Sequence, residues 1–317
     1  MNKSTIVAVT AAAMLGFGGV GTAMANTEIS GHGDIRWGAL DSDGEEGAFV
    51  ANGELDVVHN GEGASLRLDL DLLNALNSHQ GSITTTTGVD VEQLALTVPA
   101  GDMVTVMAGI LNSPVDPESQ DVTGINFAEN GLLFRALDGV HTVVGGVAAI
   151  APTDTVTVLL GFLNDAIDPL QTANGVDNSI YAGLRISPVE GVSVDVNYLT
   201  EPNETVGDVL GIGVGLDLVE NLHLSADYLA ADPAVGAGSL DNGFGIEAAY
   251  HMDKLTGAVR YEDASYEAAG SPDTTEISVA VTHECSENLN LRVDWTNVDM
   301  DTAGSQDTAT VQAVYSF

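Results

Sequence analysis

The sequence has very few cysteines and very few basic residues. Its single cysteine, Cys285, has no partner for an intramolecular disulfide, so disulfide bonds do not hold the fold together. Eight lysines and arginines stand against 46 aspartates and glutamates, which gives a formal net charge of −38. A field of this sign excludes nucleic acid as a partner and opposes binding to anionic lipid surfaces, because both carry negative charge.

Long hydrophobic runs are also missing after the first 25 residues. The longest apolar stretch there, 143–163, is interrupted by the turn residues Pro152, Thr153 and Asp154. A membrane-spanning helix needs about 20 consecutive apolar residues. If the mature chain crosses a membrane, it must therefore do so as a closed β-barrel, since only helices and closed barrels satisfy every backbone hydrogen bond in lipid.

The first 25 residues have the order of a secretory signal peptide. Lys3 is the positive residue, 6–20 is the apolar region, and Ala23-Met24-Ala25 is a small-x-small cleavage site. The alternative is a single transmembrane helix, but the apolar run is short and is broken by glycine. We therefore expect an exported protein whose mature part, 26–317, is one domain.

The excess of acidic residues has two explanations. A very acidic chain is often disordered, but an apolar content of 44% favours an ordered structure. The second explanation is a surface that stays hydrated in concentrated salt, where screening shortens charge repulsion to a few ångströms. The composition thus indicates a halophilic source.

Apolar and polar residues alternate through the mature chain with a period of two. The pattern is clearest at 64–72, 191–198 and 289–295, and strict alternation predicts strands with one apolar and one polar face. Counting such segments predicts an all-β, antiparallel up-and-down barrel of about 16 strands. We expect the strands near 28–40, 47–58, 62–73, 89–99, 102–111, 140–151, 154–165, 178–188, 191–201, 206–218, 221–231, 241–252, 254–265, 274–284, 287–298 and 306–317.

The connections between these strands alternate in length. From the second connection on, every other one is a tight turn, as at 59–63 and 99–102, and those between are longer and more polar. Short turns on one side and long loops on the other are typical of a transmembrane barrel. A soluble β-sandwich has no reason to alternate in this way. An even number of strands also places both termini on the short-turn side.

The last predicted strand ends on an aromatic residue. Ala309, Val311, Ala313, Tyr315 and Phe317 share one face, and Phe317 is the final residue. Such a strand resembles the assembly signal of Gram-negative outer-membrane proteins. The resemblance implies that the outer-membrane assembly machinery recognises Phe317 and that the barrel lies in outer-membrane lipid.

The few basic residues fall on the polar phase of their strands. Apolar neighbours such as Ile35 and Trp37 mark the lipid face, so the arginine between them faces the interior. This reasoning places five arginines in the lumen as a basic, pore-lining wall: Arg36, Arg67, Arg185, Arg260 and Arg292. Alternatively, they only neutralise interior acids, namely Asp34, Asp69, Asp195, Glu262 and Asp294.

With these features the chain resembles a sixteen-stranded Gram-negative porin over most of its mature length. In that family the third long loop folds into the barrel, and its acidic residues face arginines on the opposite wall. The resemblance implies that the connection 112–139 is this loop and that the protein is a homotrimer. The constriction acids would be Asp116, Glu118, Asp121 and Glu129, opposite the contiguous wall of Arg36, Arg67, Arg260 and Arg292.

A barrel of this strand number leaves an aqueous channel, and opposed charges at its waist would set ion preference. We therefore predict passive diffusion of small hydrophilic solutes and ions, with a mild preference for cations. The seven histidines lack metal-ligand spacing, so no metal site is predicted. No catalytic residue and no cofactor are predicted either. Two alternatives remain open. One is a structural or adhesive barrel with a closed lumen, and the other is a hydrolase using His223 and Ser225, which share a strand face.

Overall fold

The computed structural model describes residues 26–40, 48–77, 84–119, 121–137, 141–164, 178–200, 208–232, 240–266, 272–301 and 304–317. The segment 1–25, interpreted above as a signal peptide, lies outside the described residues. Among the residues described, no helix is long and apolar enough to cross a membrane.

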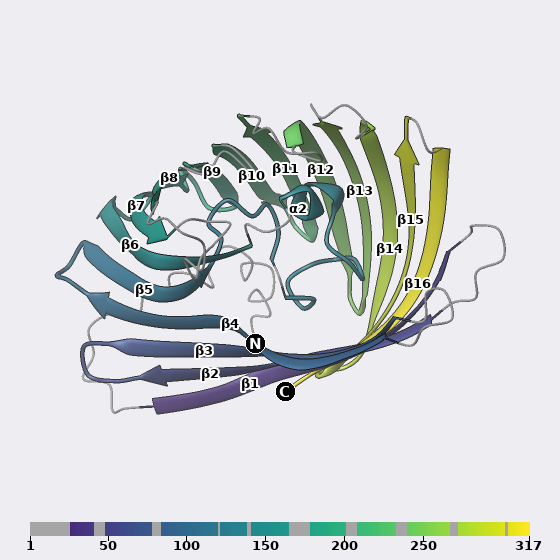
Figure 1. The fold of residues 1–317 in the computed structure, drawn as a ribbon, viewed down its shortest axis with the longest axis horizontal. Coiled ribbons are helices and arrows are strands. Elements are labelled where there is room, and N and C mark those ends of the chain that lie inside the picture. Colours follow the sequence, from purple (N-terminus) through teal and green to yellow (C-terminus); the bar gives the residue numbers. More distant parts are fainter. Residues whose placement is uncertain are drawn as a thin grey trace.

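The described residues form sixteen strands and one short helix. Each strand pairs antiparallel with the strands before and after it, and β1 pairs with β16, so the sheet closes on itself (Figure 1). The predicted sixteen-strand up-and-down barrel is confirmed. The elements are β1 (Asn26–Leu40), β2 (Ala48–Asn60), β3 (Ser65–Asn77), β4 (Thr84–Pro99), β5 (Val104–Asn112), α2 (Leu132–Ala136), β6 (Thr142–Thr153), β7 (Val156–Asn164), β8 (Asn178–Ile186), β9 (Val192–Leu199), β10 (Val209–Val219), β11 (Leu222–Ala231), β12 (Leu240–Met252), β13 (Leu255–Tyr266), β14 (Thr274–Ser286), β15 (Leu289–Met300) and β16 (Gly304–Ser316).

The strands β3 and β4 are longer than their sequence pattern indicates. We expected a connection at 74–88, but β3 continues to Asn77 and β4 starts at Thr84, with the two residues paired. Threonine favours extended backbone because its β-carbon is branched. The four consecutive threonines at 84–87 show no apolar and polar alternation, so the period-two criterion missed them.

Successive residues of each strand face opposite sides of the barrel wall. On β14, Ile277, Val279 and Val281 are exposed on the outside, whereas Ser278 and Ala280 between them are buried on the inside. An apolar surface that continues around the whole molecule suits contact with lipid rather than water. Exposed apolar side chains of this kind include Ile35, Phe49, Leu96, Phe162, Tyr198, Ile246, Val293 and Val311.

The tight turns use residues that tolerate left-handed backbone. Asn221 and Asp253 have positive φ angles of 65° and 54° in the β10–β11 and β12–β13 turns, a conformation for which Asn and Asp are enriched. In the β8–β9 turn, Gly191 has φ of 78°, and a β-carbon there would lie 2.9 Å from the backbone oxygen of Asp217. The turn sequences therefore fit close reversals of the chain.

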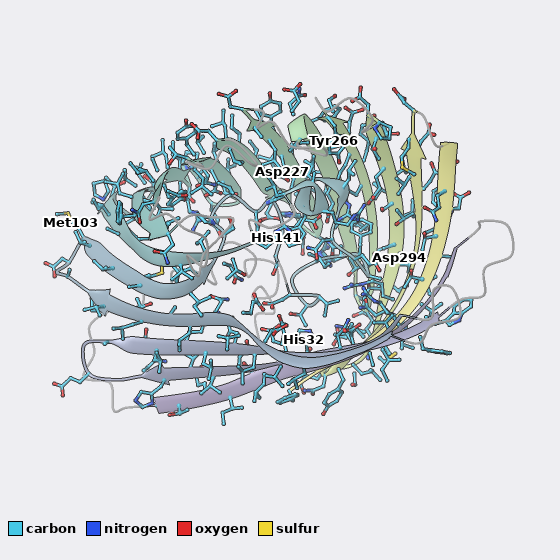
Figure 2. The ribbon with its side chains drawn as sticks, in the orientation of Figure 1. His32, Met103, His141, Asp227, Tyr266 and Asp294 are labelled. Atoms are coloured by element: carbon cyan, nitrogen blue, oxygen red, sulfur yellow. The ribbon has the colours of Figure 1, made fainter. Side chains whose placement is uncertain are left out.

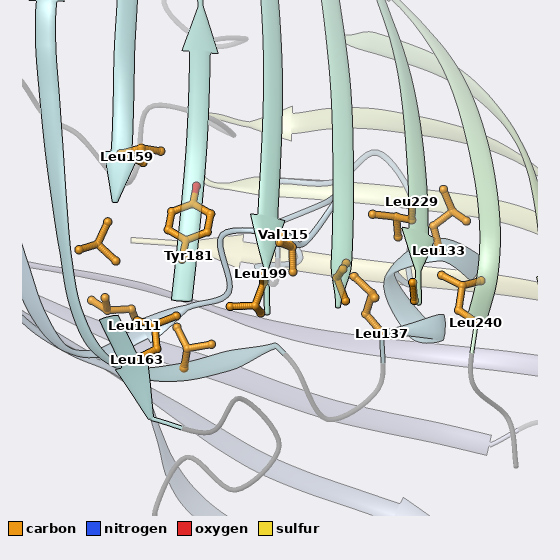
Figure 3. Packing of buried hydrophobic residues seen from close by; sticks show 14 of the residues in the cluster. Leu111, Val115, Leu133, Leu137, Leu159, Leu163, Tyr181, Leu199, Leu229 and Leu240 are labelled. Carbon is orange, nitrogen blue, oxygen red and sulfur yellow. The ribbon is translucent and has the colours of Figure 1, made fainter. Parts of the chain in front are cut away.

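The largest buried apolar cluster of the described residues lies inside the barrel, on the inner faces of β4 to β13. Leucines and valines of these strands pack against Val115, Leu133 and Leu137, which belong to the connection between β5 and β6 (Figure 3). Full burial of such a side chain contributes about 1.5–3 kcal/mol. The connection 113–141, called the inner loop below, is thus held inside the barrel by apolar packing along one wall.

The two faces of a single strand should respond differently to a new charge. On β11, Ala226 is exposed on the outside, and Ser225 points inward opposite Glu247. We expect Ala226→Arg to lower the free energy of unfolding in lipid vesicles by about 2–4 kcal/mol, the cost of a basic residue on the lipid face near mid-depth. The matched control Ser225→Arg should change it by less than about 1 kcal/mol, because its charge stays in water near a carboxylate. Equal losses in urea titrations of the two variants would contradict the inward and outward assignment.

Candidate functional site

The inner loop crosses the inside of the barrel, and its helix α2 lies against β12 and β13 (Figure 1). Glu262 of β13, which is 3% exposed, accepts hydrogen bonds from the backbone N–H groups of Leu132 at 2.6 Å and Leu133 at 3.3 Å. The first N–H groups of a helix have no partner within the helix and attract negative charge. Gly131 permits this approach, since a β-carbon there would lie 2.2 Å from a Glu262 carboxylate oxygen.

The middle of the inner loop is held by two side chains of β15. Arg292 donates from Nη2 to the backbone oxygen of Ile125 at 2.8 Å and from Nη1 to that of Phe127. Asp294 accepts from the backbone N–H of Ala128 at 2.6 Å through Oδ2. These contacts satisfy backbone groups that would otherwise be buried without partners. Strand β15 therefore fixes the path of the inner loop by binding the main chain of the loop.

Arg260 of β13 lies beneath the inner loop and is 5% exposed. It forms ion pairs with Glu118 of the loop, with Glu262 at 3.4 Å and with Glu276 of β14 at 3.3 Å. Its guanidinium carbon also lies 4.2 Å from the centre of the Phe127 ring, a distance at which a cation and an aromatic face attract each other. One buried cation thus joins two strands to two separate points of the loop.

Arg36 of β1 contacts the water-facing edge of the inner loop. Its Nη1 donates to the backbone oxygen of Ala128 at 3.0 Å and lies 3.3 Å from a carboxylate oxygen of Glu129. The Glu129 side chain is 62% exposed and that of Arg36 is 23% exposed. This pair is therefore accessible to solutes, unlike the pairs of Arg260.

The other two predicted wall arginines contact acids of the barrel strands. Arg67 of β3 donates from Nε to Asp69 at 2.5 Å and lies 3.6 Å from Asp56. Arg185 of β8 donates from Nε to Asp195 at 2.6 Å. The structure therefore brings Arg36, Arg260 and Arg292 together around the loop and leaves Arg67 and Arg185 on other parts of the inner wall.

The four predicted loop acids have separate partners. Asp116 lies 2.9 Å from the ring of His141 where the loop leaves and rejoins the wall. Glu118 accepts from the backbone N–H of Gly131 at 2.8 Å in addition to pairing with Arg260. Glu118 and Glu129 touch Arg260 and Arg36 directly, because the inner loop rests on the wall that carries these arginines. The role of the four acids at a constriction stays a prediction.

The interior acids that were predicted to neutralise the arginines fall into two groups, those that pair with an arginine and those that accept from other donors. Asp69, Asp195 and Glu262 each pair with an arginine of their own or a neighbouring strand. Asp34 instead accepts from Gln312 at 3.1 Å, and Asp294 accepts from the loop backbone. Figure 2 shows Asp294, His141 and His32 within the ring of strands.

The sequence reasoning missed a group of carboxylates on β2, β3 and β4. Glu54, Asp56, Asp69 and Glu92 approach one another, and Asp121 of the inner loop reaches the same place. The position of each residue on the inward-facing phase of its strand, which located the arginines, could also have located these carboxylates. Glu54 and Asp56, for example, share the inward phase of β2 at a spacing of two residues.

Comparisons with known proteins identify the same architecture. The family model described as Gram-negative porin matches residues 7–303. A triple mutant of the Rhodopseudomonas blastica porin has a TM-score of 0.62 at 14% identity, covering 92% of this chain and 100% of that chain. Salmonella typhi OmpF in a complex with daunomycin has a TM-score of 0.69 at 13% identity, covering 93% of this chain and 100% of that chain. At these identities the likeness shows the fold. No curated protein sequence matches.

Removing one arginine beneath the inner loop should loosen it selectively. We expect Arg292→Met, which keeps the side chain's bulk but leaves two backbone oxygens without a donor, to speed hydrogen exchange at the amide of Ala128 about 10–100-fold. This range corresponds to the about 1.5–3 kcal/mol of hydrogen bonds to a charged group. The control Arg185→Met removes an interior arginine that donates to Asp195 on the neighbouring strand, and it should leave that exchange rate unchanged. Equal rates in both variants, measured by mass spectrometry, would show that the loop does not depend on Arg292.

Proposed function

Because the chain belongs to the Gram-negative porin family, we propose that its inner loop sets the width of the channel and that interior carboxylates set the ion preference. The channel is a water-filled passage through the outer membrane for passive diffusion of small hydrophilic solutes and ions. A structural or adhesive barrel with a closed lumen is not favoured by this family membership. The members of this family are diffusion channels, not hydrolases.

The proposal rests on the contacts by which Arg36, Arg260 and Arg292 hold the inner loop, which together are called the clamp below. These residues come from β1, β13 and β15, and they hold the loop at Glu118, at 125–128 and at Glu129. A buried ion pair adds little net stability but is strongly unfavourable to break from one side. The loop is therefore a fixed constriction rather than a mobile flap.

The ion preference follows from the pairing of the interior charges. Arg36, Arg67 and Arg185 are each about a quarter exposed and each is paired with an acid. In the described part of the chain, Glu54, Glu92 and Asp121 have no lysine or arginine as a salt-bridge partner. The interior of the barrel thus holds more carboxylates than cations to pair with them, which favours cations. We assign Arg36, Arg67 and Arg185 to the water path and Arg260 and Arg292 to support of the loop.

Export and assembly belong to the same proposal. The segment 1–25 would direct secretion, and Phe317 would be recognised by the assembly machinery that inserts the barrel into outer-membrane lipid, where three copies would associate. Support comes from the barrel's closing seam. The backbone of Phe317 donates to Gly31 at 3.0 Å and accepts from it at 3.2 Å, while its side chain is 57% exposed.

Channel activity is tested by inserting the purified protein into planar bilayers. We expect discrete open-channel steps in KCl, and a reversal potential in a KCl gradient that corresponds to a preference for potassium over chloride. The physical reason is the unpaired interior carboxylate charge. The preference should fall as salt is raised, because the Debye length shortens from about 10 Å at 0.1 M to about 3 Å at 1 M. Absence of steps would end the proposal.

The role of single arginines is tested by the reversal potential of variants. Arg67→Gln should increase cation preference, because a unit charge about 8 Å from a permeating ion contributes about 0.5 kcal/mol in water, or about twofold in cation permeability. Arg260→Gln removes the same charge from beneath the loop, so it should change the channel's width and single-channel conductance more than its selectivity. The opposite ranking would show that Arg260, and not Arg67, lines the water path.

The proposed adaptation to concentrated salt has its own test. With a formal net charge of −38, the barrel should gain stability between about 0.1 M and about 1 M KCl, because screening weakens the repulsion between its carboxylates. Thermal unfolding in detergent would measure this as a rise in Tm. Equal Tm values across that range would remove the argument for a halophilic source.

A further inference from the structure

Five carboxylates gather where the inner loop reaches β2, β3 and β4. One oxygen each from Glu54, Asp56 and Asp69 lie within 4.8 Å of one another, and one each from Glu54, Glu92 and Asp121 do the same. Because Glu54 belongs to both sets, the five form one connected group, called the carboxylate group below. Asp121 comes from the loop and the other four come from three adjacent strands, so the group spans the gap between loop and wall.

The backbone of the barrel places these acids together against their mutual repulsion. Asp56 and Asp69 lie directly opposite each other in the β2–β3 pairing, and like charges at opposite positions destabilise a sheet. Glu92 is the extra residue of a β-bulge, since its neighbours Gln93 and Val91 pair with Asp69 and Leu70. Bulges re-aim a side chain, and this one turns Glu92 toward the group.

Two oxygen atoms of the group are buried without a hydrogen-bond partner. Asp69 is fully buried, and its Oδ1 has no partner among the described residues, while its Oδ2 accepts from Arg67 at 2.5 Å. Asp56 Oδ1 is likewise without a hydrogen bond, and the nearest cation, Arg67, is 3.6 Å away. A buried charge is strongly unfavourable unless it is paired or coordinates a metal.

The positive charge that faces the group is too small to balance five carboxylates. Among the residues that the structure describes, Arg67 is the one arginine that forms an ion pair with the group, and His32, 3.5 Å from Glu54, carries charge only when protonated. Glu54 and Glu92 are only 4% and 7% exposed, so bulk water screens them little. Five carboxylates in partial burial therefore require either bound protons or another cation.

A cavity adjoins the group. It has a volume of about 260 Å³ and is lined by Ser30, His32, Glu54, Asp56, Asp121 and Thr123, among others. At about 30 Å³ for each water in the liquid, this space admits an ion with much of its hydration shell. Three of the five carboxylates thus face a wet space that a small cation can enter.

We propose that the carboxylate group binds one divalent cation, with Ca²⁺ as the best fit. Carboxylate oxygens suit hard divalent cations, and Ca²⁺ takes 6–8 oxygens at about 2.3–2.6 Å in flexible geometry. Two oxygens on opposite sides of such an ion lie about 4.8 Å apart, the separation within which each set of carboxylates lies. Waters in the cavity would complete the shell.

The bound ion would give the inner loop a second attachment. Through Asp121 it would tie the loop to Glu54 and Glu92, on strands other than those that carry Arg36, Arg260 and Arg292. It would also cancel part of the negative charge that we assign to cation preference. This inference rests on the proposed function, since it makes the ion preference of the same constriction depend on divalent cations.

Calorimetric titration of the purified protein with CaCl₂ in KCl buffer tests the site directly. We expect saturable binding of one Ca²⁺ per chain with a Kd below about 1 mM, the range of extracellular Ca²⁺ sites. Glu54→Gln, at the residue shared by both sets, should raise the Kd at least about tenfold. The control Glu190→Gln removes the same charge from the exposed β8–β9 turn, outside the group, and it should change the Kd less than about twofold. No saturable binding, or equal effects of the two variants, would overturn the proposal.

A second variant and a second measurement guard against misfolding. If Glu54→Gln does not fold to a heat-modifiable barrel, Asp121→Asn makes the corresponding change on the loop, outside the barrel strands, with the same expected rise in Kd. In planar bilayers, Ca²⁺ should lower the cation preference of the unaltered protein and leave that of Asp121→Asn unchanged. A channel that conducts normally and shows no response to Ca²⁺ would overturn the cation site alone, whereas absence of conductance would overturn the proposed function.

Discussion

The structure depends on the pairing of the first strand with the last. In lipid each backbone N–H and C=O needs a partner within the protein, and the β1–β16 register supplies the partners that an open sheet would lack. Closure fixes an inside and an outside, and the pleat then sends alternate residues to each. Every interior feature follows from that division. The clamp on the inner loop exists because β13, β15 and β1 lie almost side by side across the seam.

The interior is divided chemically as well as geometrically. Between β4 and β13 the inner wall carries a buried apolar cluster that packs against Val115, Leu133 and Leu137 of the inner loop. Along β13 to β1 it is charged and holds the loop through guanidinium groups and carboxylates. Along β2 to β4 it carries carboxylates that exceed their cations. One loop therefore meets three chemically different surfaces of the inner wall.

The sequence predicted the barrel and the inward arginines because both depend on a period of two residues, which each strand displays locally. Arg36, Arg67, Arg185, Arg260 and Arg292 could be placed on the inner face without knowing any contact. Their partners could not be predicted in this way. The contact of Arg292 with the backbone of Ile125 and Phe127 joins residues far apart in the chain and uses main-chain atoms that leave no mark on the sequence. The bulge at Glu92 and the extended threonine run at 84–87 could not be predicted, because both interrupt the alternation of apolar and polar residues that marks the other strands.

The two kinds of attachment of the inner loop differ in their thermodynamic signatures. Apolar packing at Leu133 and Leu137 weakens on cooling and strengthens with salts that are excluded from protein surfaces. The exposed pair of Arg36 and Glu129 is weakened by any added electrolyte. Concentrated solutions of such salts would therefore shift the support of the inner loop from this exposed ion pair toward apolar packing. Because the two attachments respond to them in opposite directions, the loop would stay attached over a wider range of salinity than either attachment alone would allow.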